Sequence, residues 1–386
     1  MNTNFPVIKL TRELISKESV TPEDKGAMDV VVKRLEKLGF KNKLLPFGKS
    51  RNGTKVLNLF AVSKKTNKKI LCFAGHTDVV PTGNVGAWKH KPFAGKISNS
   101  RIYGRGASDM KGAIAAWICA CENVVLKNKM NIALAMLITG DEEGIAKNGT
   151  KKVVEWLKKS KTHLDHCLVG EPTNPLKIGE MVKVGRRGSL SLVIEIRGQA
   201  GHVAYPQLAI NPHKTLIKIC DGLIKLKLHK KAEKFPVSNL EITSIDTGNK
   251  ITNVIPDSTK IRLNIRYNTA YNEASLIAAI TKICKKYTKN YKINIISSNH
   301  PFFTKNSIFT DLLIKAIKKN TKTKTVLSTT GGTSDARFIK DLCPVIEFGG
   351  VGQTMHKINE NMRLKDLLLL QKIYEDFIIY YNDFYK

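Results

Sequence analysis

Hydrophobic and polar positions alternate along the chain, up to Lys183, in a way that predicts strands separated by helices. Apolar residues at helical spacing indicate helices at 24–39, 110–125 and 150–158. Continuous apolar runs indicate strands at 56–62, 69–74, 132–139 and 166–169. Strands that alternate with helices predict a mixed, mostly parallel sheet with helices on both faces, which is an α/β fold.

The pattern changes after Lys183, where the predicted order becomes strand, helix, strand, strand, helix, strand. These elements fall at 189–197, 212–225, 240–245, 258–267, 272–287 and 291–297. The order is typical of a ferredoxin-like α+β layer that is complete in itself. A helix near 308–319, a strand at 345–348 and a helix at 364–381 then resume the first pattern.

We therefore expect two domains, because a chain of 386 residues is long enough for two cores. The first domain is built from residues 1–184 and 299–386. The second is an insertion at 185–298.

The composition is that of a globular protein, with 42% apolar residues and no apolar stretch near the roughly 20 residues that span a bilayer. The N-terminal residues lack a basic region followed by an apolar one, so we expect no secretory signal and no membrane association. The seven cysteines show no Cys-x-x-Cys spacing, which predicts reduced core residues and a cytoplasmic location.

The formal charge of +32 raises nucleic acid as a partner. However, the basic residues are 52 Lys and only 12 Arg, and they are spread through nearly every surface-type segment. Base readout and bidentate phosphate contacts favour Arg. We therefore expect no specific nucleic-acid partner, although weak polyanion binding is consistent with this charge.

Acidic residues and histidines recur along the chain at points where predicted strands or helices begin or end. They are His76, Asp78, Asp109, Glu142, Glu143, Glu171 and His356. Ligands of open α/β sheets bind at the carboxyl ends of the strands. Two imidazoles and three carboxylates suit zinc or a similar divalent ion, and one shared carboxylate would make the set sufficient for two ions.

Each of these residues also has an ordinary structural interpretation. A His-x-Asp sequence is more often a polar turn, and Asp109 before a predicted helix fits a simple N-cap. The adjacent Glu142 and Glu143 favour chemistry, since one carboxylate can bind a metal while its neighbour acts as general base.

Several motifs resemble the metallopeptidase M20 family of co-catalytic zinc hydrolases, in the family's order and nearly from end to end. The metal-site motifs are Gly75–Pro81, Gly104–Gly112, Gly140–Gly144 and Gly170–Thr173. Later motifs are Gly185–Leu190, Gly201–Pro206, Thr252–Pro256 and Gly331–Phe338. The resemblance implies a zinc-exopeptidase-like catalytic domain, an inserted dimerisation or lid domain, and a metal-dependent hydrolase of linear amides.

The resemblance also implies a role for each site residue. His76 and Glu171 would bind one ion and Glu143 and His356 the other, with Asp109 bridging them. The ions would be Zn²⁺, with Co²⁺ an alternative in one site. Asp78 would orient His76, Glu142 would be the base, and the peptide after Asp109 would be cis.

The inserted domain would form a homodimer in which His202 reaches the partner's active site. Substrate contacts are expected from Arg186, Ser189, Tyr205, Asn253, Arg266, Gly332, Thr333 and Arg337. Guanidinium groups and glycine-rich main chain suit a small substrate with several carboxylates.

Two other hypotheses remain. Another amidase of the same family would share the metals but differ in acyl specificity. A basic, non-enzymatic binding protein on this scaffold would be expected to lack part of the ligand set.

Overall fold

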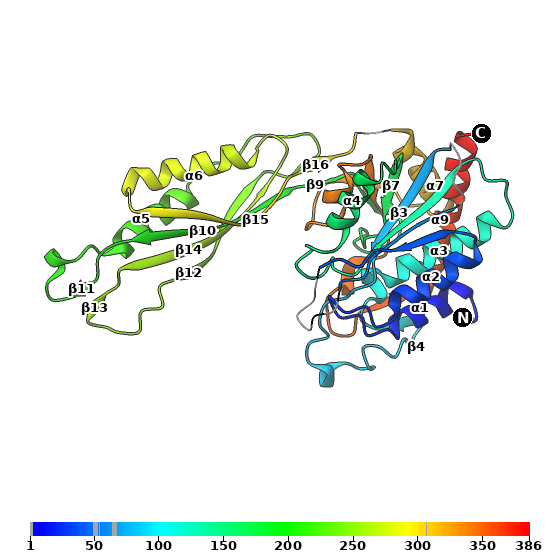
Figure 1. The fold of residues 1–386 in the computed structure, drawn as a ribbon, viewed down its shortest axis with the longest axis horizontal. Helices are drawn as coiled ribbons and strands as arrows, with labels where there is room; N and C mark the ends of the chain where they lie inside the picture. The colour runs from blue at the N-terminus through cyan, green and yellow to red at the C-terminus, as the bar shows by residue number, and fades with distance from the viewer. Residues whose placement is uncertain (1–2, 49–52, 54, 64–67, 306) are drawn as a thin grey trace. The chain divides into compact units, whose positions relative to one another are not determined.

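The computed structural model describes residues 3–48, 53, 55–63, 68–305 and 307–386, and it divides the chain into two compact units. The large unit comprises Met1–Val184, Thr304–Ser328 and Ser334–Lys386. The small unit comprises Gly185–Phe303 and Thr329–Thr333. The small unit thus extends beyond residue 298, where the expected insertion ended. Figure 1 shows the elements of both units.

The first part of the large unit contains α1 (Pro6–Ile15), α2 (Ala27–Lys37), β1 (Lys41–Leu44), β2 (Leu59–Val62), β3 (Ile70–His76), η1 (Val85–Ala87), β4 (Lys96–Ser98), β5 (Arg101–Tyr103), η2 (Ala107–Lys111), α3 (Gly112–Val125), β6 (Ala133–Thr139), α4 (Thr150–Lys159), β7 (His166–Val169) and β8 (Met181–Lys183). Its second part contains α7 (Ile308–Asn320), β17 (Val326–Ser328), α8 (Ala336–Ile339), β18 (Val345–Glu347), η4 (Gly352–Thr354), β19 (Asn361–Arg363) and α9 (Leu364–Phe384).

The main sheet of the large unit has the strand order β1-β2-β6-β3-β7-β18-β8-β17. Its central strands β6, β3, β7 and β18 run parallel, whereas β1 and β2 add antiparallel strands at one edge. The sheet is therefore mixed and mostly parallel at its centre, which confirms the predicted α/β class.

Helices cover both faces of this sheet, as the side chains of neighbouring strands show. Phe73 of β3 lies opposite Met136 of β6, whereas Phe60 of β2 lies opposite the next residue, Leu137. Because successive strand residues point to opposite faces, Phe60 and Phe73 do so too. Phe73 stacks on Trp117 of α3, and the ring of Phe60 lies 5.9 Å from that of Trp156 of α4. Thus α3 and α4 cover opposite faces.

The small unit contains β9 (Gly185–Arg186), β10 (Gly188–Arg197), β11 (Gly201–His202), η3 (Pro206–Leu208), α5 (Pro212–Ile224), β12 (Asn239–Asp246), β13 (Val254–Ile255), β14 (Ser258–Tyr267), α6 (Glu273–Tyr287), β15 (Tyr291–Asn299) and β16 (Phe302–Phe303). Its four-stranded antiparallel sheet has the order β12-β14-β10-β15.

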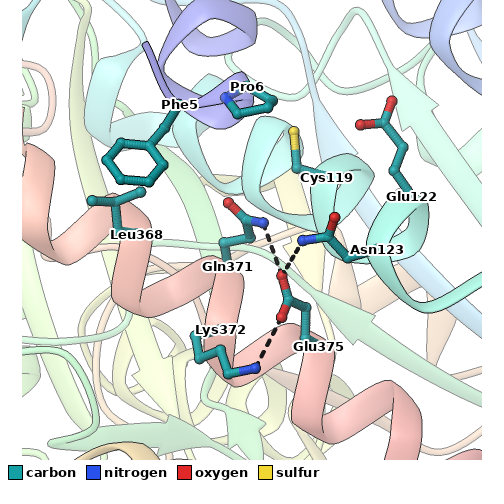
Figure 2. Close-up of a pocket in the computed structure, with 9 residues that line it drawn as sticks. All are labelled: Phe5, Pro6, Cys119, Glu122, Asn123, Leu368, Gln371, Lys372 and Glu375. Carbon is teal, nitrogen blue, oxygen red and sulfur yellow. Dashed lines mark hydrogen bonds and ion pairs between the residues drawn. The ribbon is translucent and has the colours of Figure 1, made fainter. Parts of the chain in front are cut away.

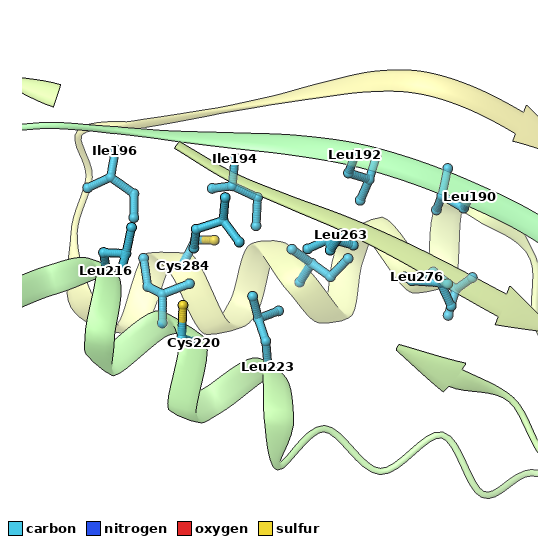
Figure 3. Close-up of a cluster of buried hydrophobic side chains, with 14 of the residues drawn as sticks. Leu190, Leu192, Ile194, Ile196, Leu216, Cys220, Leu223, Leu263, Leu276 and Cys284 are labelled. Atoms are coloured by element: carbon cyan, nitrogen blue, oxygen red, sulfur yellow. The ribbon is translucent and has the colours of Figure 1, made fainter. Parts of the chain in front are cut away.

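The core of the small unit lies between this sheet and the helices α5 and α6 (Figure 3). Alternate residues of β10 point into it, including Leu190, Leu192, Ile194 and Ile196, all fully buried. The element order β10, α5, β12, β14, α6, β15 confirms the predicted sequence of strands and helices.

One local prediction near the site differs from the structure, and one alternative interpretation is excluded by it. The strand expected at 69–74 continues through His76, which is the last residue of β3. Asp109 is not an N-cap, because the first regular turn of α3 is preceded by Lys111, and Asp109 itself has non-helical dihedral angles within η2. The peptide bond between Asp109 and Met110 is cis, as the resemblance implied. Within the described ranges, no helix has both the length and the apolar character needed to cross a membrane.

Candidate metal centre

The carboxyl ends of four neighbouring parallel strands bring the predicted ligands to one edge of the sheet in the large unit. His76 ends β3, Glu142 and Glu143 follow β6, and Glu171 follows β7. His356 lies nine residues beyond the end of β18. Parallel strands end at the same edge, so the main-chain topology accounts for the convergence of these residues, whereas Asp109 comes from η2.

One group of ligand atoms forms around His76. Its Nε2 lies 3.2 Å from Oδ1 of Asp109 and 3.9 Å from Oε1 of Glu171. The ligand atoms of these three residues all lie within 4.8 Å of one another, as a single metal ion requires.

A second group forms around His356. Its Nε2 lies 2.8 Å from Oε1 of Glu143 and 3.3 Å from Oδ2 of Asp109. Asp109 thus directs one carboxylate oxygen toward each imidazole. His76, Glu142 and Glu143 form a further group within the same distance limit.

The main chain sets the tautomer of His76. Its Nδ1 lies 2.9 Å from the carbonyl oxygen of Asp78, which can only accept, so Nδ1 carries a hydrogen and Nε2 is the nitrogen that faces Asp109 and Glu171. The carboxylate of Asp78 is farther away, at 3.7 Å, and it accepts the main-chain N–H groups of Glu142 and Glu143 at 3.2 and 3.0 Å. The carboxylate of Asp78 therefore does not hydrogen-bond to the imidazole. Instead, it ties the end of β3 to the segment that carries the two glutamates.

The carboxylates of the site stabilise positive charge on the groups that lie between them. Burial alone would lower the pKa of His76, but the surrounding carboxylates, with Asp109 first, raise it well above its usual value. Hydrogen bonds to Asp109 and Glu143 raise the pKa of His356 to about 10. Burial would raise the pKa of Asp109, yet the two imidazoles lower it. The nitrogen and oxygen donors that face one another here fit divalent metal ions, which would supply that positive charge.

Glu142 differs from these ligands in its electrostatics. Burial first, and then the negative charges of Glu171, Asp335 and Glu143, raise its pKa well above the usual value. Burial also raises the pKa of Asp78, to about 6. A raised pKa makes a carboxylate a stronger base than it would be in water.

The predicted substrate contacts within the small unit form two separate groups. Arg186, Ser189 and Arg266 lie where β10 begins and β14 ends, and Ser189 and Arg266 are direct cross-strand partners. The loop with Gly332 and Thr333 belongs to the same region, since Nη1 of Arg186 donates to the carbonyl of Thr330 at 3.3 Å.

His202, Tyr205 and Asn253 lie beyond the other end of these two strands. The main-chain N–H of Val203 donates to the carbonyl of Asn253 at 3.1 Å, and the rings of His202 and Tyr205 lie 5.8 Å apart. All three side chains are exposed. β10 separates the two groups, and its ten residues, at about 3.3 Å each, span roughly 30 Å. Figure 1 shows β11 and β13 at one end of the sheet and β9 and β16 at the other. The remaining predicted contact, Arg337, is on α8 of the large unit.

Sequence analysis missed two buried charged residues that contact the ligand segments, Arg105 and Glu360, which are 2% and 0% exposed. Arg105 lies within a recognised motif, but its partner is 255 residues away. Nothing in the local pattern around Glu360 indicated a role.

A cavity of about 310 Å³ in the large unit contains none of the metal ligands (Figure 2). Its carboxylate Glu375 already accepts from Asn123, Gln371 and Lys372. Burial raises the pKa of the Cys119 thiol to about 12, so this cysteine is not a nucleophile at neutral pH. We assign no function to this cavity.

The model of Peptidase family M20/M25/M40 matches residues 72–380, and the chain belongs to this family. It is 48% identical over 376 residues to a succinyl-diaminopimelate desuccinylase of Pelagibacter ubique, with 96% of this chain and 97% of the relative covered. It is 46% identical over 374 residues to the enzyme of the same name from Ehrlichia chaffeensis, with 97% of both chains covered.

Solved structures with the same fold include a family M20 metallo-carboxypeptidase from Sulfolobus solfataricus, with a TM-score of 0.79, 21% identity, and 98% of this chain and 100% of that chain covered. Another is a dinuclear metal-binding M20 peptidase from Bacillus subtilis, with a TM-score of 0.68, 14% identity and 98% of both chains covered.

Proposed function

We propose that this protein is a metal-dependent amide hydrolase that cleaves N-succinyl-LL-2,6-diaminopimelate to succinate and LL-2,6-diaminopimelate, a step of lysine and diaminopimelate biosynthesis. The observation that carries the hydrolase proposal is the position of Asp109, whose two carboxylate oxygens face the two imidazoles at 3.2 and 3.3 Å. The succinylated substrate is supported by relatives that are named succinyl-diaminopimelate desuccinylase. They are 43–48% identical to this chain and match it over nearly their whole length.

His76 and Glu171 would hold one ion, Glu143 and His356 the other, and Asp109 both. The mixed nitrogen and oxygen donors favour Zn²⁺, with Co²⁺ an alternative in one site. Ions bound here supply Lewis acidity to the amide carbonyl and lower the pKa of water.

Glu142 would act as the general base and then as the general acid. It takes a proton from the attacking water and returns it to the departing amine, which its raised pKa favours. Asp78 supports both His76, through its carbonyl, and Glu142, through its carboxylate.

The substrate carries several carboxylates, and the arginines are the natural partners for them. Arg186, Arg266 and Arg337 would bind the carboxylates. Ser189, Gly332 and Thr333 would add hydroxyl and main-chain donors. Tyr205 and Asn253, which lie near His202, would contact the substrate of a partner protomer.

We assign His202 to the active site of a partner protomer, where it would stabilise the oxyanion of the reacting amide. The separation of roughly 30 Å along the strands of the small unit supports this assignment, because residues at both ends cannot contact one small substrate within the same protomer.

The small unit would therefore form a homodimer. Ile217 and Ile224 lie seven residues apart on α5, hence on the same face of the helix, and they are 65% and 73% exposed. Ile295 and Ile296 are exposed on the edge strand β15. Exposed apolar side chains such as those on α5 and β15 are typical of surfaces that an interface covers.

A double substitution, Ile217→Lys with Ile224→Lys, tests the dimer by light scattering after size exclusion. Leu126→Lys in the large unit is a matched control, because Leu126 is also exposed. A monomeric double variant beside a dimeric control supports the interface, and a dimer in both variants contradicts its placement on α5.

A mixing experiment tests whether His202 acts in the partner. His202→Ala and Glu142→Gln homodimers, each inactive, are exchanged into heterodimers. If His202 acts across the dimer, one site of each heterodimer is complete, and about a quarter of the wild-type activity returns. No recovery after complete exchange contradicts the assignment.

Substrate specificity is tested by parallel assays on N-succinyl-LL-2,6-diaminopimelate and N-acetylornithine at defined zinc loading. Preference for the acetylated compound would favour a deacetylase of the same family. Turnover should disappear on chelation and return with zinc. A protein that binds no metal and hydrolyses neither compound would instead be a non-enzymatic binding protein.

We propose that this reaction takes place in the cytoplasm. All seven cysteines are free and buried, as expected of a chain kept in a reducing compartment. The basic surface is assigned no specific nucleic-acid partner, and no membrane partner is proposed.

A further inference from the structure

A buried ion pair lies directly behind the carboxylate that faces both imidazoles. Glu360 is fully buried, and its Oε1 accepts the main-chain N–H groups of Ser108 and Asp109 at 2.9 and 3.1 Å. Its Oε2 accepts from Nη1 of Arg105 at 2.8 Å. One carboxylate therefore holds the main chain of Asp109 and a guanidinium group together, through charge-assisted hydrogen bonds.

The same guanidinium group reaches the segment that carries His356. Nη1 of Arg105 donates to the carbonyl of Lys357 at 3.1 Å, and Nη2 donates to the carbonyl of His356 at 3.4 Å. Nη2 also donates to the carbonyl of Pro81, at 3.2 Å, in the loop that follows Asp78. A single side chain thus joins segments from three distant parts of the sequence.

The backbone of His356 needs such support. Its φ is +61°, a left-handed conformation that costs a non-glycine residue energy and persists only where surrounding contacts hold it. Hydrogen bonds from Arg105 to the carbonyls of His356 and Lys357 supply those contacts on the main chain. The side chain of His356 is about half exposed, so packing around the ring contributes less.

We propose that Glu360 and Arg105 are positioning residues that set the separation of Asp109 and His356, and thereby determine how tightly the centre binds its metal ions. Neither residue would touch the substrate or an ion. This inference rests on the metal centre of the proposed function and goes beyond it, because it assigns metal affinity to residues outside the ligand set.

The competing interpretation is a purely structural ion pair, whose loss destabilises the fold and nothing else. The substitution Glu360→Gln distinguishes the positioning role from a purely structural one. The substitution keeps the volume of the side chain and an oxygen for the N–H groups of Ser108 and Asp109, but it turns an amide donor toward Arg105. Partners that orient metal ligands typically change metal affinity by about 10–100-fold when they are mutated.

The matched control is Glu122→Gln, which makes the same chemical change in another ion pair of the large unit. Glu122 accepts from Nε and Nη2 of Arg34 at 2.7 and 2.6 Å, and neither residue contacts a ligand segment. Both substitutions are expected to lower the melting temperature of the metal-free protein.

Zinc dissociation constants are measured by titration of metal-free wild type, Glu360→Gln and Glu122→Gln with Zn²⁺ against a competing chelator. The dissociation constant of Glu360→Gln should rise by about 10–100-fold, and that of Glu122→Gln should stay at the wild-type value. Equal zinc affinity in all three proteins would overturn the inference. Should Glu360→Gln not fold, Arg105→Lys is titrated in its place, since it keeps the charge opposite Glu360 but loses the fork that reaches the carbonyls.

The wild-type titration keeps this test separate from that of the metal centre. Failure of the wild type to bind two zinc ions would count against the proposed function. Two bound ions with unchanged affinity in the variant would count only against the role of Glu360 and Arg105.

Discussion

Replacing Glu142 and Glu143 by glutamine, one at a time, should show which of them is the general base and which is a metal ligand. Glu142 and Glu143 are neighbours in sequence, and Asp78 accepts the main-chain N–H of both. Neither substitution removes these main-chain hydrogen bonds, so the supporting structure is the same in both variants. The variants then differ only in which carboxylate is lost.

The expected magnitudes follow from where the two carboxylates lie. Loss of a general base typically costs about 10²–10⁴-fold in rate, or roughly 3–5 kcal/mol of transition-state stabilisation. Glu142→Gln should therefore keep two metal ions and lose that factor in kcat. Oε1 of Glu143 lies 2.8 Å from Nε2 of His356, so Glu143→Gln removes one of the three donors of its group. That variant should retain close to one ion.

The assay combines metal analysis by mass spectrometry with turnover of the succinylated substrate at several zinc concentrations. Added zinc should restore part of the activity of Glu143→Gln and none of that of Glu142→Gln. Near wild-type turnover by Glu142→Gln would remove Glu142 from the role of base. If the Glu142→Gln variant lost a metal ion, Glu142 would be a metal ligand instead.

The remaining predictions concern stability and pH. A Cβ at Gly349 would lie 2.6 Å from the carbonyl oxygen of Glu171, so Gly349→Ala should displace that ligand segment, lower zinc content and cost about 1–3 kcal/mol; unchanged zinc content would refute this. Ile194→Ala removes buried volume from the core of the small unit (Figure 3) and should destabilise that unit by about 2–5 kcal/mol, against about 0.5–1.5 kcal/mol for Ile194→Val, as measured by denaturant unfolding. Burial lowers the pKa of His166, whose Nδ1 lies 2.7 Å from the hydroxyl of Tyr381. A lowered pKa means that the unfolded chain binds the proton more readily, so this contribution to stability is present above about pH 6.5 and is lost as the pH falls. The difference in unfolding free energy between wild type and His166→Gln should therefore shrink from pH 7.5 to 5.5, and a constant difference would contradict the shift.

The sequence by itself determined the order of the helices and strands and the edge of the main sheet at which the candidate metal ligands lie. Hydrophobic periodicity is a local property, and it located the strands before His76, Glu142 and Glu171 because buried parallel strands are continuous apolar runs. The ends of these strands then indicated these three residues as candidate ligands, because parallel strands end at one edge of the sheet. The motifs that resemble the M20 family led to the same residues.

Only the tertiary structure decided which groups meet and through which atoms. His76 donates to the carbonyl of Asp78 rather than to its carboxylate, and Asp109 is not a helix cap. Glu360 holds the main chain of Asp109 across 251 residues of sequence. No local pattern encodes such a contact, because its energy depends on two segments that become neighbours only once the sheet has formed.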